Sequence, residues 1–100
     1  ISPSSTNVPD KFSLEQNFPN PFNPTTNINY SIPFDSKVLI KIFDMTGKEI
    51  KEIVNELQKA GSYSINFNAS EFASGTYFYK ITALNSKENF TSTKKMILVK

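Results

Sequence analysis

The strongest constraint on this chain is an alternation of apolar and polar residues that recurs along most of its length. In segment 26–34, for example, Ile28, Tyr30 and Ile32 stand at every second position. This period is typical of a β-strand with one buried face, and turn-forming residues interrupt it about every ten residues. The predicted strands cover 12–18, 26–34, 38–43, 48–54, 62–68, 76–82 and 90–99. The pattern predicts an all-β chain, an immunoglobulin-like β-sandwich of about seven antiparallel strands.

Two of these segments need a further argument. In segment 38–43 both sets of alternating residues are partly apolar, which predicts a strand covered on both sides. Segment 48–57 shows helical spacing in its apolar residues, which are Ile50, Ile53, Val54 and Leu57. It nevertheless lies between turn signals, with Asp44 and Gly47 before it and Ala60-Gly61 after it. We therefore expect a strand over 48–54 and a hairpin turn in which Gly47 adopts a positive φ.

A rigid loop is predicted where proline and asparagine crowd together. The segment reads Phe18, Pro19, Asn20, Pro21, Phe22, Asn23 and Pro24. Three prolines in seven residues exclude a helix and a central strand. We expect Phe18 and Phe22 to anchor this loop in the core from either side, together with Phe12 and Leu14 of the first strand. A packed turn at one end of the sandwich is favoured over a ligand site.

Composition excludes several classes of function. The 100 residues contain no Cys and no His, so disulfides, thiolate metal sites and histidine-based catalysis are absent from the sequence. The nine carboxylates are scattered, and Asn20 and Asn23 lack the neighbouring carboxylates that a calcium site normally has. We expect no enzyme, no cofactor and no metal.

The charged residues also limit the partners. All eleven basic residues are Lys, whereas nucleic-acid binding usually relies on Arg, so we expect no nucleic acid. No apolar run reaches the length of a transmembrane segment. Hydrophobic residues make up 38% of the chain, which is enough for one folded core.

The two ends of the chain differ in character. Segment 1–11 is rich in Ser, Thr, Asn and Pro and reads as a linker accessible to proteases, followed by a folded domain over 12–100. Because the chain starts at Ile1, we expect it to be a piece of a longer precursor. The chain ends in a short apolar run between lysines, made up of Lys94, Lys95, Met96, Ile97, Leu98, Val99 and Lys100. This tail either completes its own sheet or offers a strand to a partner, and its lysines also suit an edge strand protected from aggregation.

Four blocks carry a resemblance to a known family. They are 17–26, 38–48, 75–81 and 94–100, and they include the proline loop, the turn with Asp44 and Gly47, and the tail. In this order the blocks resemble the C-terminal sorting domain of proteins exported by the bacterial type IX (Por) secretion system.

The resemblance implies an Ig-like domain that directs an upstream cargo domain of the same precursor across the outer membrane. It implies the type IX translocon and a cell-surface peptidase as partners, with the tail 94–100 as the recognised part and segment 1–11 as the cleavage region. It implies a final location outside the cell or on the outer-membrane surface, reached through the periplasm.

Two alternatives remain open from the residues. One is an Ig-like spacer or adhesion module, since flagellar hook-capping proteins contain an Ig-like domain with similar middle blocks. The other is a carbohydrate-binding module with an exposed aromatic platform made of Tyr63, Tyr77, Phe78 and Tyr79.

Overall fold

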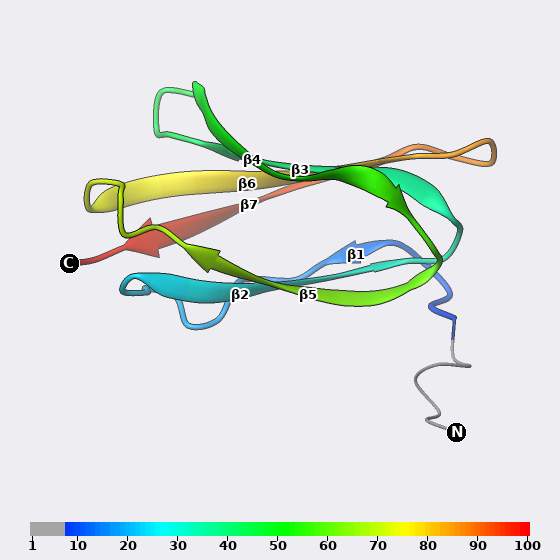
Figure 1. Cartoon of the computed structure of the whole chain (residues 1–100), viewed down its shortest axis with the longest axis horizontal. Coiled ribbons are helices and arrows are strands. Elements are labelled where there is room, and N and C mark those ends of the chain that lie inside the picture. The colour runs from blue at the N-terminus through cyan, green and yellow to red at the C-terminus, as the bar shows by residue number, and fades with distance from the viewer. Residues whose placement is uncertain (1–7) are drawn as a thin grey trace.

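The computed structural model describes residues 8–100 and shows two packed antiparallel sheets (Figure 1). The strands are β1 (Ser13–Leu14), β2 (Thr25–Ile32), β3 (Ser36–Phe43), β4 (Glu49–Gln58), β5 (Gly61–Asn68), β6 (Gly75–Leu84) and β7 (Phe90–Leu98). One sheet has the order β1-β2-β5 and the other β4-β3-β6-β7. The predicted all-β, immunoglobulin-like sandwich is confirmed. No helix in the described part of the chain is long and apolar enough to cross a membrane.

The core lies between the two sheets and follows the predicted alternation. Tyr30 and Ile28 of β2 face Ile40 of β3 and Ile81 of β6, and each has an exposed fraction of 1% or less. Because every second residue of a strand points to the same face, the predicted inward residues of these strands form one continuous cluster. Phe67 belongs to this cluster, and the partly buried Phe72 packs against it with ring centroids 6.2 Å apart.

Irregular pairing between β4 and β3 explains the helical spacing of the apolar residues in β4. The strand ends four residues later than predicted, at Gln58, and its pairing with β3 shifts register twice. Ile50 and Ile53 are the two residues passed over by these shifts, so they have no partner in the β3 register. A β-bulge changes which residues face inward, and here Ile50, Ile53 and Val54 all pack against the core. Leu57, the last residue of the apparent helical stripe, is 82% exposed.

Two further expectations need correction. The first strand is limited to β1, because Asn17 turns into the interior and interrupts the predicted segment 12–18. The strand β3 is central in its sheet, but Leu39 and Phe43 on its outer face are only half-buried. The described residues form only two sheets, so no third layer packs on this outer face within residues 8–100. Most of the predicted linker 1–11 lies outside the described residues.

Candidate recognition site: the proline loop and the tail

The tail forms the second half of the edge strand β7. In the ladder with β6, Met96 pairs with Tyr77 and Leu98 pairs with Gly75. Met96 and Leu98 are buried, with exposed fractions of 0% and 1%, and Ile97 faces the opposite side of the sheet. The predicted apolar run is therefore an integral part of the core.

The other edge of the tail is occupied by the proline loop. The backbone N–H of Phe22 donates to the carbonyl of Ile97 at 2.9 Å, and the N–H of Val99 donates back to the carbonyl of Phe22 at 2.9 Å. The side-chain oxygen of Asn20 accepts from the N–H of Ile97, also at 2.9 Å. Gln16 adds a bond of 2.6 Å from its Nε2 to the carbonyl of Lys95. The outward backbone groups of this stretch thus already have partners within the domain.

A buried polar cluster holds the loop in place. Asn17 is 2% exposed, and its Nδ2 donates to Thr26 Oγ1 at 2.9 Å and to the carbonyl of Pro19 at 3.1 Å. Thr26, itself 1% exposed, donates from Oγ1 to the same Pro19 carbonyl at 2.8 Å. Since each of these buried polar groups has a partner, the cluster fixes the loop conformation without leaving an uncompensated desolvation cost.

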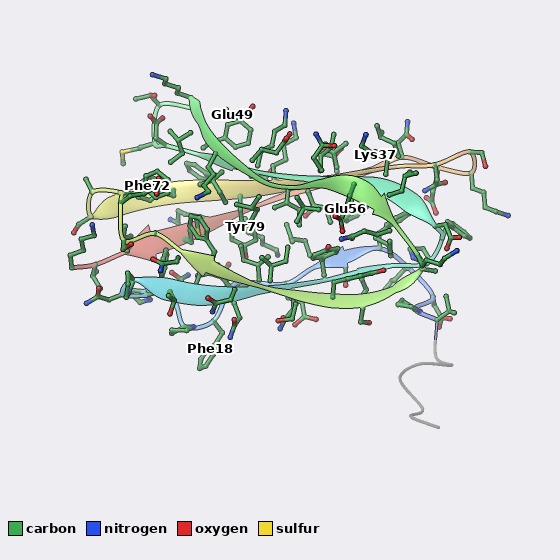
Figure 2. The ribbon with its side chains drawn as sticks, viewed as in Figure 1. Phe18, Lys37, Glu49, Glu56, Phe72 and Tyr79 are labelled. Carbon is green, nitrogen blue, oxygen red and sulfur yellow. The ribbon has the colours of Figure 1, made fainter. Side chains whose placement is uncertain are left out.

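Tyr79 connects this cluster to the core. Its hydroxyl accepts from the backbone N–H of Asn17 and donates to the carbonyl of Glu15, both at 2.7 Å. Figure 2 shows Tyr79 between the two sheets. Burial raises the pKa of the Tyr79 hydroxyl to about 12, against the opposing effect of the hydrogen bond from Asn17. The hydroxyl is therefore protonated at neutral pH and can serve as donor and acceptor at once.

The predicted turn at residues 44–48 is confirmed, at the other end of β3. Asp44 Oδ1 accepts from Thr46 Oγ1 at 2.6 Å, from the N–H of Thr46 at 2.9 Å and from the N–H of Lys48 at 3.1 Å. The hydrogen bonds to Thr46 and Lys48 hold the pKa of the Asp44 carboxyl below its usual value. Gly47 has the predicted positive φ of 90°. Asp44 and Gly47 therefore have a clear role in shaping this turn.

The loop residues separate into buried and exposed sets. Phe22 is 2% exposed and anchors the loop, as expected, whereas Phe18 is 77% exposed and the prediction that it enters the core is wrong. Pro19, Asn20, Pro21 and Asn23 are exposed, and Pro24 is intermediate. The lysines of the tail also differ: Lys94 is half-buried, Lys95 is exposed, and Lys100 donates to the carbonyl of Ser70 at 2.8 Å.

The sequence alone did not indicate that Gln16, Asn17, Thr26 and Tyr79 meet at this site. Asn17 and Thr26 lie at the ends of the family block 17–26, and Tyr79 was considered only for an aromatic platform. A polar residue directly before a proline-rich turn is a weak indication of a buried cap. Nothing local in the sequence indicates that Tyr79, more than sixty residues away along the chain, completes the cluster.

The structure offers little support for two other kinds of site. The aromatic platform of a carbohydrate-binding module is not formed, because Tyr77 and Tyr79 point into the core with exposed fractions of 9% and 0%. A metal site at the proline loop also lacks support. The side-chain oxygen of Asn20 accepts a hydrogen bond from the tail. Residues 8–100 contain no cluster of three or more His, Cys, Asp or Glu residues that could hold a metal ion.

The fold and this loop–tail junction place the chain among Ig-like β-sandwich domains whose final strand is built into the core. A family model described as the secretion system C-terminal sorting domain matches residues 16–100. Because this match covers most of the chain, the chain belongs to that family, the sorting domains of the type IX (Por) system. These domains are sorting signals and not catalysts, and membership implies export to the cell surface or beyond.

Solved structures support the fold. Dimeric latent PorU from Porphyromonas gingivalis aligns with a TM-score of 0.71 and 21% identity, over 93% of this chain and 10% of that chain. CopC from Methylosinus trichosporium OB3b aligns with a TM-score of 0.59 and 20% identity, over 87% of this chain and 92% of that one. At these identities the likeness concerns the fold alone, and this chain spans only a tenth of the PorU chain. No match was found among curated proteins.

Proposed function

We propose that the type IX translocon recognises the folded junction of the proline loop and the tail, and so exports a cargo domain joined to the N-terminal side of this chain. Segment 1–11 would then be cut by a cell-surface peptidase, and the cargo would end outside the cell or on the outer-membrane surface, after passing through the periplasm. The observation that carries the proposal is the pairing of Phe22 with Ile97 and Val99, which joins two family blocks from opposite ends of the chain.

This geometry favours recognition of a folded surface over recognition of a free strand. The backbone groups of Lys95, Ile97 and Val99 that face away from β6 already bond to Gln16, Asn20 and Phe22. A partner that added a strand along this stretch would first have to displace the loop. The side chains of Lys95, Val99 and Lys100 remain accessible for a partner, because all three are exposed.

The proposal is tested by fusing residues 1–100 to the C-terminus of a periplasmic fluorescent protein in a type IX-competent cell. Removal of 95–100 alone is an ambiguous test, since it also deletes the buried Met96 and Leu98. A sharper variant is Lys95→Gln with Lys100→Gln, which leaves the core intact. The matched control is Lys37→Gln, an exposed lysine at the start of β3.

We expect the wild-type fusion and the Lys37→Gln control to reach the surface or the medium, and the double tail variant to accumulate in the periplasm. A folded wild-type fusion that stays in the periplasm would favour a spacer or adhesion module. If the tail variant and the control are exported equally well, Lys95 and Lys100 are not part of the surface that the translocon recognises.

A further inference from the structure

In residues 8–100 the two sheets have four edges, and three of these edges are protected against pairing with another strand. The edge of β7 is covered along the tail by the proline loop and Gln16. The strand β1 has only two residues, and Phe18 pairs with β2 beside it. The edge strand β4 carries the charges of Glu49, Lys51, Glu52 and Glu56 and has two register shifts. Short strands, charges and bulges are the features by which natural sheets prevent edge pairing.

The fourth edge, β5, has none of these protections. Its residues Gly61–Asn68 include no charge and no proline, and it pairs with β2 over eight residues without a register shift. The strand β2 is also uncharged, but it is central in its sheet. Thus β5 has the composition of an interior strand at the position of an edge strand. A regular, uncharged edge is a template for a further strand.

The pairing of β2 shows which backbone groups of β5 face the open edge. Asn27 exchanges both of its backbone hydrogen bonds with Phe18, on the side away from β5. Because successive residues of an antiparallel strand bond to opposite sides, the neighbouring Ile28 bonds toward β5, where its partner is Ile65. The same alternation turns the N–H and C=O groups of every second residue of β5 outward, and no residue of 8–100 bonds to them. This open set is Ser62, Ser64, Asn66 and Asn68.

The open set is complementary to itself. In an antiparallel pair of two copies with Ile65 opposite Ile65, Ser62 faces Asn68 and Ser64 faces Asn66. Each of these residues then exchanges both hydrogen bonds with another member of the open set, so every open N–H and C=O group obtains a partner. A shift of two residues in either direction leaves groups at one end of the strand unpaired.

The side chains of β5 already pair with residues of their own type. Across the β2–β5 ladder, the rings of Tyr30 and Tyr63 stack with centroids 5.3 Å apart. The Nδ2 of Asn66 donates to Asn27 Oδ1 at 3.1 Å. A second β5 would offer the same residue types on the other side of the strand.

The charges beside β5 also suit a second copy. The register that pairs Ile65 with itself, continued past both strand ends, brings Lys59 of one copy toward Glu71 of the other, and both residues are exposed. Glu15 lies on the far side of β2, where its N–H donates to the carbonyl of Asn29, so it does not enter the contact between the two β5 strands. Opposite charges at both ends favour the antiparallel arrangement.

The core is least covered along this same side of the sandwich. Figure 1 shows β4 and β5 nearest the viewer, on the side opposite β1 and β7. Of the eight half-buried apolar residues that pack against the core, five belong to β4 and β5: Ile50, Ile53, Val54, Tyr63 and Ile65. A second copy along β5 would remove part of this apolar surface from water.

We propose that two copies of this chain form a two-fold symmetric dimer through β5, which joins their three-stranded sheets into one continuous sheet of order β1-β2-β5-β5-β2-β1. A two-fold interface uses the same surface on both copies, and the self-complementary open set meets this requirement. The junction of the proline loop and the tail lies on the other side of each sandwich, so the dimer presents it twice. The dimer does not depend on the proposed function, because it is a property of the isolated chain.

A cysteine at position 65 tests the register directly. Ile65 and its copy form a pair without mutual hydrogen bonds, whose Cα atoms lie about 4.5 Å apart, a separation that a disulfide can bridge. The chain contains no Cys, so Ile65→Cys introduces its only thiol. Under mild oxidation with oxidised glutathione, we expect most of this variant to become a covalent dimer. The matched control is Ser62→Cys, whose two copies would lie about 20 Å apart and should remain largely uncrosslinked.

A pair of charge variants tests the interface without a covalent bond. Ser64→Lys with Asn66→Lys places like charges opposite each other at two sites of the dimer, and we expect the dissociation constant to rise at least about tenfold. Ser64→Lys with Asn66→Glu places opposite charges at the same two sites and should keep the dissociation constant within about threefold of wild type. Sedimentation equilibrium of the 100-residue chain over a concentration series measures both, and circular dichroism checks that each variant is folded.

The outcomes decide the proposal. A concentration-dependent wild-type dimer that the lysine pair disrupts, the lysine–glutamate pair keeps and position 65 crosslinks would support it. A wild-type chain that stays monomeric overturns it and leaves the β5 edge to a strand of another protein. A dimer that the folded lysine pair does not weaken forms through another surface, which also overturns it. Crosslinking at position 62 as fast as at position 65 contradicts the register. If the isolated chain dimerises but the export fusion fails, only the proposed function is refuted.

Discussion

Tyr79→Phe removes a single hydroxyl that two parts of the recognition site share. The substitution leaves the buried ring in place within the core, so it creates almost no cavity. What it removes is the acceptor of the Asn17 N–H and the donor to the Glu15 carbonyl. The predicted effect therefore concerns hydrogen bonding and not packing.

The magnitude follows from the burial of the two partners. The bond to Glu15, an exposed residue, should contribute about 1 kcal/mol, because water replaces it in the variant. The N–H of Asn17 belongs to a residue that is 2% exposed, and leaving it without an acceptor should cost a further 1–3 kcal/mol or so. We expect a total loss of about 2–4 kcal/mol, which lowers the melting temperature of a domain of this size by roughly 10–20 °C.

The assay is urea denaturation with amide hydrogen exchange on the same samples. The matched control is Tyr77→Phe on the same strand, whose hydroxyl bonds only to the carbonyl of the exposed Ala73 and should cost less than about 1 kcal/mol. In Tyr79→Phe, exchange at the N–H groups of Phe22 and Val99 should accelerate, because the loop loses part of its support. A loss of less than about 0.5 kcal/mol, or a loss equal to that of Tyr77→Phe, would refute the reasoning that the hydroxyl supports the loop.

Three further predictions follow from the core, the turn and the buried tyrosines. Ile81→Ala should cost about 2–5 kcal/mol, since the side chain is fully buried, while Leu57→Ala should change stability by less than about 0.5 kcal/mol; equal effects in thermal melts would contradict the core assignment. Gly47→Val should destabilise by about 1–2 kcal/mol through its φ of 90° alone, because no atom lies within 4 Å of an added Cβ, and an unchanged melting temperature would disprove the turn. The pKa values of Tyr30 and Tyr79 are both raised to about 12 by burial, so the folded state keeps them neutral where unfolded tyrosines ionise. This stabilisation is present below pH 10 and is lost as the pH rises toward 12. The loss should be about 1–2 kcal/mol per tyrosine. Denaturation curves at pH 8, 10 and 11.5 on wild type, Tyr30→Phe and Tyr79→Phe would measure it.

The sequence by itself determined the strands and most of the core, because the period of two is a local property that the pleat of a strand imposes. Ile28, Tyr30 and Ile32 were assigned to the interior from spacing alone, and all three are buried. The turn at Gly47 was equally predictable, since only a few residues adopt a positive φ without strain. The family blocks could also be recognised without any knowledge of where they meet.

The tertiary structure decided which of two similar phenylalanines enters the core. Phe18 and Phe22 lie four residues apart in the same loop, and nothing local distinguishes them. Phe18 pairs with Asn27 and so faces outward with it, whereas Phe22 pairs with Leu98 and so faces inward. The orientation of each ring depends on its strand partner, and strand partners are chosen by contacts far apart in the sequence.

The same physical reason applies to the bulges of β4 and to the closure of the tail. Both depend on the pairing register. Ile50 and Ile53 pack against the core because each is the extra, unpaired residue at a register shift between β4 and β3. The bond from the Ile97 N–H to Asn20 spans 77 residues, and it converts a strand that looked open in the sequence into one enclosed on both sides. Local periodicity determines which face of a segment is apolar, but only the assembled sheets determine what that face meets.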